Sequence, residues 1–290
     1  MASQPFGFLN IDKPVGMTSH DVVGHARRVF RMKKIGHAGT LDPLASGVLV
    51  LCVGGATRLS DYVMHSTKRY RAHVRLGAVT DTYDAEGEVT PVADPGGITT
   101  EAIERALDAF RGEIDQLPPM YSAIKQGGRK LYELARAGQT VERQPRRVTI
   151  HALDLCEWTP PDLTLDVTCS AGTYIRSLAH DLGQSLGVGG YLTALVRTAS
   201  GSFRLEDSIS LSALSEAGEP EQFLIPPRQA LADWPSLELT DEAVDRVRHG
   251  RAISGVAADG TIAFAYGPNG GLVAVLRAEG GMWKPQKVFL

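Results

Sequence analysis

Cysteine is scarce in this sequence, and the few residues present form no pattern. The 290 residues include three cysteines, Cys52, Cys156 and Cys169, and no two of them make a CxxC pair. Disulfide frameworks and zinc sites need paired or clustered cysteines. We therefore expect reduced thiols that pack in the core.

Long apolar segments are also absent. The longest strongly apolar run, GVLVLCVGGA, is far shorter than the roughly 20 residues of a membrane-spanning helix. The first residues, MASQPFGFLNIDKP, lack the basic and apolar regions of a signal peptide. With 43% hydrophobic and 22% charged residues, the composition is typical of a globular protein. We expect a cytoplasmic location and no membrane association.

Common cofactor motifs are missing as well. The sequence contains no GxxxxGK[ST] phosphate loop and no GxGxxG fingerprint, which argues against nucleoside triphosphates and dinucleotides. It has no HExxH and no histidine–cysteine cluster that would bind a metal ion. We expect chemistry that needs neither a cofactor nor a metal.

The net charge of −3 is unevenly distributed. Residues 21–37 carry five bases against one acid, and residues 125–147 carry seven bases against two acids. In contrast, residues 205–245 carry ten acids against one base. Local basic surfaces favour phosphate binding whatever the charge elsewhere, although solvated helix faces are an alternative for either run.

One carboxylate stands in a stretch rich in conformational constraints, GHAGTLDPLASG, residues 36–47. Pro43 disfavours the helical conformation for Asp42, and the three glycines allow unusual backbone angles or close approaches. The buried strand predicted at VLVLCVG would support this loop rigidly. An Asp-Pro turn without chemistry is the alternative.

Two further residues are placed where function could use them. In KRYRAHVRLG, residues 68–77, apolar and basic residues alternate, so Tyr70 is either a core residue or a stacking platform at the rim of the core. Arg176 falls in the first turns of a helix predicted within 172–187, where the helix dipole disfavours a cation and a nearby anion would explain it. A carboxylate beside an arginine and a tyrosine suits a nucleophile or a charge stabiliser at a sugar carbon, and the arginine would lower the pKa of the acid.

Six motifs in order resemble the TruB-type tRNA pseudouridine synthases and cover roughly residues 7–205. They are KPVGMTS (13–19), GHAGTLDPLASG (36–47), KRY (68–70), LPPMYSAIK (117–125), GTYIRSLAHDLG (172–183) and LTALVRTASGSF (192–203). The resemblance implies an α+β pseudouridine-synthase fold with a mixed, mainly antiparallel central sheet flanked by helices. It also implies a small C-terminal β-rich, PUA-like domain.

The resemblance further implies the activity and the site. The chain would isomerise uridine 55 in the T-arm loop of tRNA by base flipping, without a cofactor. Asp42, Tyr70 and Arg176 would be catalytic, and Asp42 would attack either the sugar or the base. The implied substrate-binding residues are His37, Tyr174, Leu195 and Lys125.

The same likeness suggests how the chain is organised. We expect a catalytic domain over 1–232 with an RNA-gripping insertion at about 117–147, and a PUA-like domain over 233–290. The expected partner is tRNA, with no obligatory protein partner and a monomeric state. Two alternatives stay open: a nucleic-acid N-glycosidase, which would release free base, and a non-catalytic RNA-binding or RNA-chaperone protein.

Overall fold

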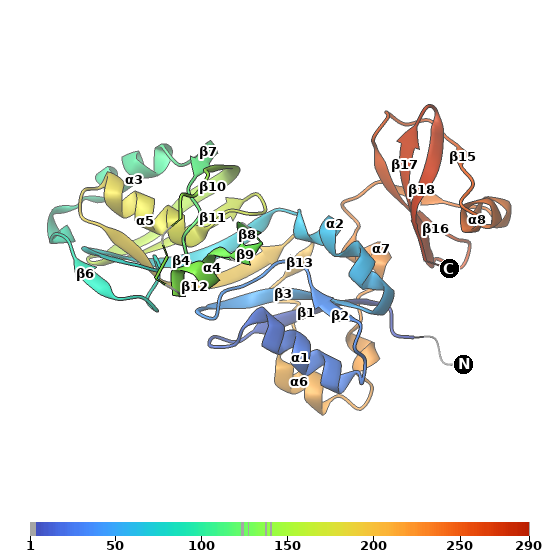
Figure 1. Cartoon of the computed structure of the whole chain (residues 1–290), viewed down its shortest axis with the longest axis horizontal. Coiled ribbons are helices and arrows are strands. Elements are labelled where there is room, and N and C mark those ends of the chain that lie inside the picture. The colour runs from blue at the N-terminus through green and yellow to red at the C-terminus, as the bar shows by residue number, and fades with distance from the viewer. Residues whose placement is uncertain (1–3, 123–124, 127, 137, 140, 290) are drawn as a thin grey trace.

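The computed structural model describes residues 4–122, 125–126, 128–136, 138–139 and 141–289. Figure 1 shows a large sheet with helices on its faces and, at one end, a smaller β-rich module that contains the C-terminus. Among the described residues, no helix has both the length and the apolar character needed to cross a membrane.

The large sheet is mixed and mainly antiparallel, as predicted. Seven strands run in the order β1-β3-β12-β4-β11-β10-β7, with β2 paired to β3 and β13 to β12. The β3–β12 pair is parallel, and the others in this sheet are antiparallel. The strand bounds are β1 Gly7–Lys13, β2 Ile35–His37, β3 Ala45–Val53, β4 Lys68–Leu76, β7 Gly112–Gln116, β10 Arg146–Thr159, β11 Asp162–Cys169, β12 Gly190–Ser200 and β13 Phe203–Arg204.

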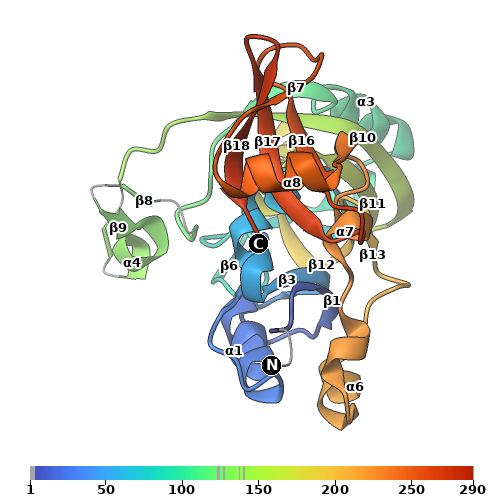
Figure 2. The same cartoon turned by 90° about the vertical axis from the view of Figure 1, so that its right-hand side faces the viewer.

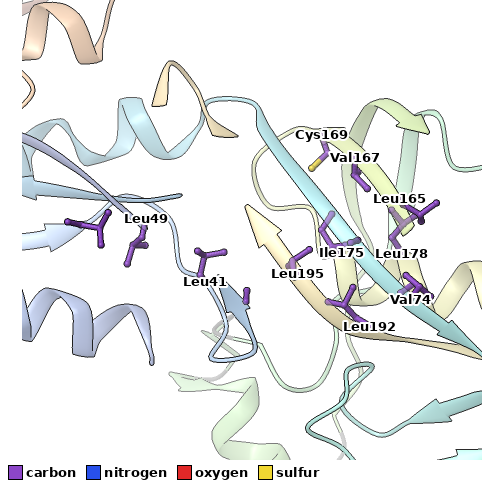
Figure 3. Close-up of a cluster of buried hydrophobic side chains, with 14 of the residues drawn as sticks. Leu41, Leu49, Val74, Leu165, Val167, Cys169, Ile175, Leu178, Leu192 and Leu195 are labelled. Atoms are coloured by element: carbon purple, nitrogen blue, oxygen red, sulfur yellow. The ribbon is translucent and has the colours of Figure 1, made fainter. Parts of the chain in front are cut away.

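Strand β3 is covered on both faces, which confirms the reading of its uninterrupted apolar run. Leu49 and Leu51 belong to the main core, while Val48 and Val50 face a second core shared with the C-terminal module. Figure 3 shows Leu41 among the labelled side chains of the main core, together with Leu49 and Leu195. The residue before Asp42 is therefore anchored in the core.

The stretch TSHDVVGHARRVFRMKK predicts an amphipathic helix capped by Thr18 or Ser19. Helix α1 (Ser19–Val29) begins at this cap but ends earlier than the pattern predicts. Thr18 and Asp21 form a reciprocal capping box at its start. The amphipathic pattern continues to Lys34, but the helix stops at Val29 because Arg31 adopts a left-handed conformation, with φ of 50°. Arg31, Lys33 and Lys34 are exposed, so this basic run is a surface feature.

The remaining helices pack around the sheet or lie in connections. Helix α5 contacts β12 and β4, and α6 lies beside α1 near β1 (Figure 1). The bounds are α2 Ser60–Met64, α3 Thr100–Asp108, α4 Leu131–Arg136, α5 Ile175–Ser185, α6 Leu211–Glu216, α7 Pro227–Ala230 and α8 Asp241–Arg248, with 3-10 turns at Gly54–Leu59, Pro95–Gly97 and Pro220–Phe223.

Two short hairpins complete the larger part of the chain. β5 (Ala78–Thr80) pairs with β6 (Val89–Pro91). β8 (Lys125–Gln126) pairs with β9 (Arg129–Lys130) inside the predicted insertion. Figure 2 shows β8, β9 and α4 standing to one side of the large sheet.

The C-terminal module is a five-stranded sheet with helix α8 beside it. Its order is β14-β16-β17-β18-β15. Phe264, Tyr266 and Val275 join the second core, which also contains Phe8 and Phe203 of the larger part. The module is therefore fixed by shared apolar packing. The strand bounds are β14 Ser236–Glu238, β15 Ile253–Ser254, β16 Ile262–Tyr266, β17 Leu272–Glu279 and β18 Met282–Val288.

Candidate active site

The loop that carries Asp42 is held between β2 and β3. Gly39 and Gly47 have φ of 106° and 94°, in the left-handed region that favours glycine. A Cβ on Gly47 would lie 2.4 Å from the backbone oxygen of Arg197, so β3 and β12 approach too closely for any side chain there. Ser19 Oγ also exchanges hydrogen bonds with the backbone of Leu41, at 2.8 and 3.0 Å.

Arg197 ties this loop to β12. The residue is 1% exposed, and its guanidinium donates hydrogen bonds to the carbonyl oxygens of Val48, Gly39 and Thr40 at 2.6, 3.2 and 3.4 Å. Our sequence reasoning missed this residue as a site component. The signal was present, because a single arginine interrupts the apolar part of LTALVRTAS.

Arg176 connects Asp42 to a second carboxylate. Its Nη2 lies 3.0 Å from Asp42 Oδ2, and its Nη1 lies 3.2 Å from Asp84 Oδ2. The anion predicted beside this helix start is therefore present, and there are two of them. Arg176 and Asp84 are buried, whereas 40% of the Asp42 side chain is exposed. Asp84 was not singled out in the sequence, where it lies in the turn-rich stretch TDTYDAEG.

Effects of opposite sign set the pKa of the Asp42 carboxyl. Although part of the side chain faces the pocket, the surrounding protein displaces water from the carboxyl, and this desolvation is the largest effect and raises the pKa above its usual value. The positive charge of Arg176 lowers the pKa, and the negative charge of Asp84 raises it further. From the sequence we expected only the arginine to shift the pKa of Asp42, and the effect of the arginine is smaller than that of desolvation. A carboxylate with a raised pKa is a stronger base and nucleophile than an exposed aspartate.

Tyr70 contacts both the core and the site. It packs against the main core and lines the pocket that contains Asp42. Burial raises the pKa of its hydroxyl, and Arg197 opposes this rise. Tyr70 is therefore a core residue that also reaches the pocket, and its use as a stacking platform stays a prediction.

These residues surround a pocket of about 300 Å³. The predicted site residues that line it are Asp42, Tyr70, Tyr174, Arg176 and Leu195. His37 is not part of this lining: it lies on β2, and its buried Nδ1 has no hydrogen-bond partner within the described part of the chain. The side chain of Lys125 lies outside the described residues.

Two lysines near the site are buried. Lys13 is fully buried, and its Nζ donates to the carbonyl oxygens of Met17 and Pro14 at 2.6 and 2.8 Å. Lys68 lines the pocket, and its Nζ donates to the carbonyl oxygens of Met64, the last residue of α2, and of Ser66. Burial lowers the pKa of Lys13 to about 8 and that of Lys68 to about 7.

The basic row on β4 is largely neutralised. Arg71 forms a bidentate pair with Asp166, and Arg75 forms one with Asp162, both on β11. The alternation predicted from the sequence is correct, but neighbouring carboxylates balance these two arginines. The free positive charge of this face is smaller than the sequence indicates.

The described chain offers no metal-binding cluster at this site. Within residues 4–122 and the later described ranges, no cluster of three or more histidine, cysteine, aspartate or glutamate side chains could hold a metal ion.

Solved structures share this fold over nearly the whole chain. A Cbf5–Nop10–Gar1 complex matches with a TM-score of 0.78 and 30% identity, over 99% of this chain and 85% of that one. An H/ACA RNP bound to a substrate RNA that contains 2′-deoxyuridine matches with a TM-score of 0.77 and 27% identity, over 99% and 86% of the two chains. The shared fold, together with the matches to family models, places the chain in the class of pseudouridine synthases.

Family models identify the branch. The N-terminal domain of TruB family pseudouridylate synthases matches residues 27–175, the tRNA pseudouridylate synthase B C-terminal domain matches 176–231, and the tRNA pseudouridine synthase II C-terminal model matches 234–290. The chain belongs to the TruB family. It is an isomerase that converts uridine to pseudouridine.

Curated relatives agree with this assignment. A tRNA pseudouridine synthase B of Symbiobacterium thermophilum is 51% identical over 254 residues, 87% of this chain and 84% of the relative. The protein with the same name from Thiobacillus denitrificans is 46% identical over 285 residues, 98% and 95% of the two chains.

Proposed function

We propose that this enzyme isomerises uridine 55 in the T-arm loop of tRNA. The observation that supports the site most directly is the ion pair between Asp42 and Arg176 in a pocket of about 300 Å³. The names of the relatives support tRNA as the substrate. The position within tRNA follows from the family resemblance of the motifs.

The reaction rearranges bonds within one nucleotide. The N1–C1′ bond breaks, the base turns, and a C5–C1′ bond forms, while the proton on C5 leaves and N1 gains one. No electron or chemical group is supplied from outside, so we propose a cofactor-free reaction. Asp42 acts on the ribose C1′ or on the base, and Arg176 keeps its carboxylate oriented.

The pocket requires the uridine to leave its stack. Flipping a base costs about a few kcal/mol, and stacking on an aromatic ring returns about 1–3 kcal/mol. We assign that stacking to Tyr70, which also assists proton removal. Tyr174 and Leu195 hold the uracil, and His37 and Lys125 contact the RNA outside the described pocket.

The domain boundaries stay part of this proposal. The catalytic domain spans 1–232, the RNA-gripping insertion lies at about 117–147, and the PUA-like domain spans 233–290. The short connection between α7 and β14, which carries no helix or strand, supports a boundary at this point. A cytoplasmic location and a monomeric state stay predictions.

Tritium release tests the activity. Wild-type enzyme is incubated with a T-arm hairpin that carries [5-³H]uridine, and Asp42→Asn is compared at equal RNA occupancy. We expect release by the wild type, none by Asp42→Asn, and similar Kd values. Full activity of Asp42→Asn contradicts the catalytic role. Pseudouridine mapping of unmodified total tRNA then tests position 55.

The alternatives give different products in the same assay. Free uracil without pseudouridine would indicate an N-glycosidase. RNA binding without either product would indicate an RNA-binding or RNA-chaperone protein.

A further inference from the structure

Tyr83 has a backbone conformation that aromatic residues rarely adopt. It follows β5, and its φ is 64°, in the left-handed region. Arg31 is the other non-glycine residue of the described chain with positive φ, and it ends α1. Such strain persists only where surrounding contacts enforce it, and it gathers at functional sites.

The contact that holds Tyr83 is a ring stack on His180. The ring centroids are 3.9 Å apart and the planes differ by 13°. His180 lies one helical turn after Arg176 on α5, so the two side chains share a face of that helix. His180 Nδ1 is buried without a hydrogen-bond partner in the described chain. The imidazole of His180 therefore interacts with Tyr83 through the face of its ring.

The backbone turn at Tyr83 brings both of its neighbours to Arg176. The carbonyl oxygen of Thr82 accepts a hydrogen bond from Arg176 Nη1 at 3.2 Å. The carboxylate of Asp84 lies 3.2 Å from the same nitrogen. Tyr83 itself is fixed on its other side, because its carbonyl oxygen accepts from Leu192 N at 3.0 Å.

We propose that the Tyr83–His180 stack positions Arg176 against Asp42, so that both aromatic residues are positioning residues for the isomerisation. This inference rests on the roles proposed above for Asp42 and Arg176. Without the stack, the turn at Tyr83 loses its side-chain contact with α5, and Thr82 and Asp84 no longer converge on Nη1. Neither ring lines the pocket, so the loss falls on the chemical step and not on RNA binding.

Single-turnover tritium release at saturating enzyme separates these effects. Tyr83→Asn keeps a residue that tolerates the left-handed region but removes the ring, and His180→Ala removes the other half of the stack. We expect each to lower the rate constant by about 10- to 100-fold, the range that small misplacements of catalytic groups cause. The Kd for the hairpin should not change.

Two conservative variants and a double variant sharpen the test. Tyr83→Phe and His180→Phe keep two planar rings and should retain the wild-type rate constant. The double variant Tyr83→Asn/His180→Ala should be no slower than the slower single variant, because both remove one contact. His151→Ala, an exposed histidine on β10, is the matched control and should behave as the wild type.

The outcomes separate this inference from the proposed function. The positioning role is wrong if Tyr83→Asn and His180→Ala fold and keep the wild-type rate constant. It is also wrong if these variants change only the Kd for the hairpin, or if His180→Phe folds but has a lowered rate constant. If Asp42→Asn or Arg176→Lys is also fully active, the proposed site fails as well. Thermal unfolding checks folding. Should His180→Ala not fold, His180→Leu fills the space without a planar ring, and its rate constant decides in the same way.

Discussion

The carboxylate of Asp84 lies 3.2 Å from Nη1 of Arg176, and both side chains are buried. Asp84 is itself held, because its Oδ1 accepts hydrogen bonds from the Thr82 hydroxyl at 2.6 Å and from Glu86 N at 3.1 Å. Asp84 is thus the permanent counter-ion of the guanidinium, while the other end of that guanidinium faces Asp42 and the pocket.

Replacing Asp84 by asparagine should impair both catalysis and stability. Asp84→Asn leaves a buried guanidinium with one carboxylate in place of two. Loss of one partner of a buried pair typically costs about 3–5 kcal/mol, so we expect the free energy of unfolding in urea to fall by an amount of this order. The single-turnover rate constant should fall by about 10-fold or more, because Arg176 is then misplaced.

The exposed pair Arg71–Asp166 provides the control for Asp84. Its side chains are 52% and 43% exposed, and exposed pairs contribute about 0–1 kcal/mol. Asp166→Asn should therefore change neither the rate constant nor the unfolding midpoint measurably. Equal effects of the two substitutions would show that burial of Asp84 is unimportant.

Arg197→Lys should disturb the Asp42 loop although it preserves the charge. A lysine ammonium cannot reproduce the planar fork that donates to Val48, Thr40 and Gly39. Buried carbonyls that lose a donor cost about 1–3 kcal/mol each. We expect a lower midpoint in thermal unfolding and a lower rate constant at saturating RNA. A fully active, equally stable Arg197→Lys would contradict the role of this fork.

The lowered pKa of Lys68 predicts how the free energy of unfolding depends on pH. Burial lowers its pKa from 10.5 to about 7 in the folded chain. Between these values the unfolded chain binds more protons than the folded chain, so stability rises with pH from about 7 to about 10.5. Urea unfolding across this range should show a steeper rise for the wild type than for Lys68→Met.

The control for Lys68 is an exposed lysine. Lys33 is exposed, so Lys33→Met should leave the slope of stability against pH as in the wild type. Parallel slopes for wild type and Lys68→Met would mean that Lys68 stays charged when buried.

The paired arginines of β4 should contribute little to RNA binding. Arg71 and Arg75 are already neutralised by Asp166 and Asp162. Arg71→Ala should therefore leave the Kd for tRNA and its salt dependence almost unchanged. In contrast, the double variant Lys33→Ala/Lys34→Ala removes two exposed charges. If both contact phosphate, the slope of log K against log salt should become shallower by up to about 2. A large effect of Arg71→Ala would contradict this assignment.

The elements that could be predicted are those with strong local signals. The buried strand at residues 48–53 and the cap at Thr18 depend on short-range pattern, and both are observed. Arg176 was found because a cation at a helix start is unfavourable without a nearby anion. Asp42 was found because its neighbours constrain the backbone.

Asp84 and Arg197 could not be found in the same way. Their roles depend on which strands become neighbours, and a local window does not contain that information. Arg197 lies beside the Asp42 loop because β3 and β12 pair in parallel. Asp84 lies beside Arg176 because the loop after β5 packs against α5. The end of α1 was missed for a related reason, since an arginine in the left-handed region gives no sequence signal.

The position of β12 between β3 and β4 has a consequence for how the enzyme is made. Its parallel register joins Leu195 to Ala45, so the two halves of the pocket come from distant parts of the chain. During synthesis the Asp42 half leaves the ribosome long before the Arg176 half. The central strand must then insert between partners that were made earlier, and contacts of such long sequence separation form slowly. Catalytic competence is therefore acquired late, and the return of activity on refolding reports assembly of the whole sheet.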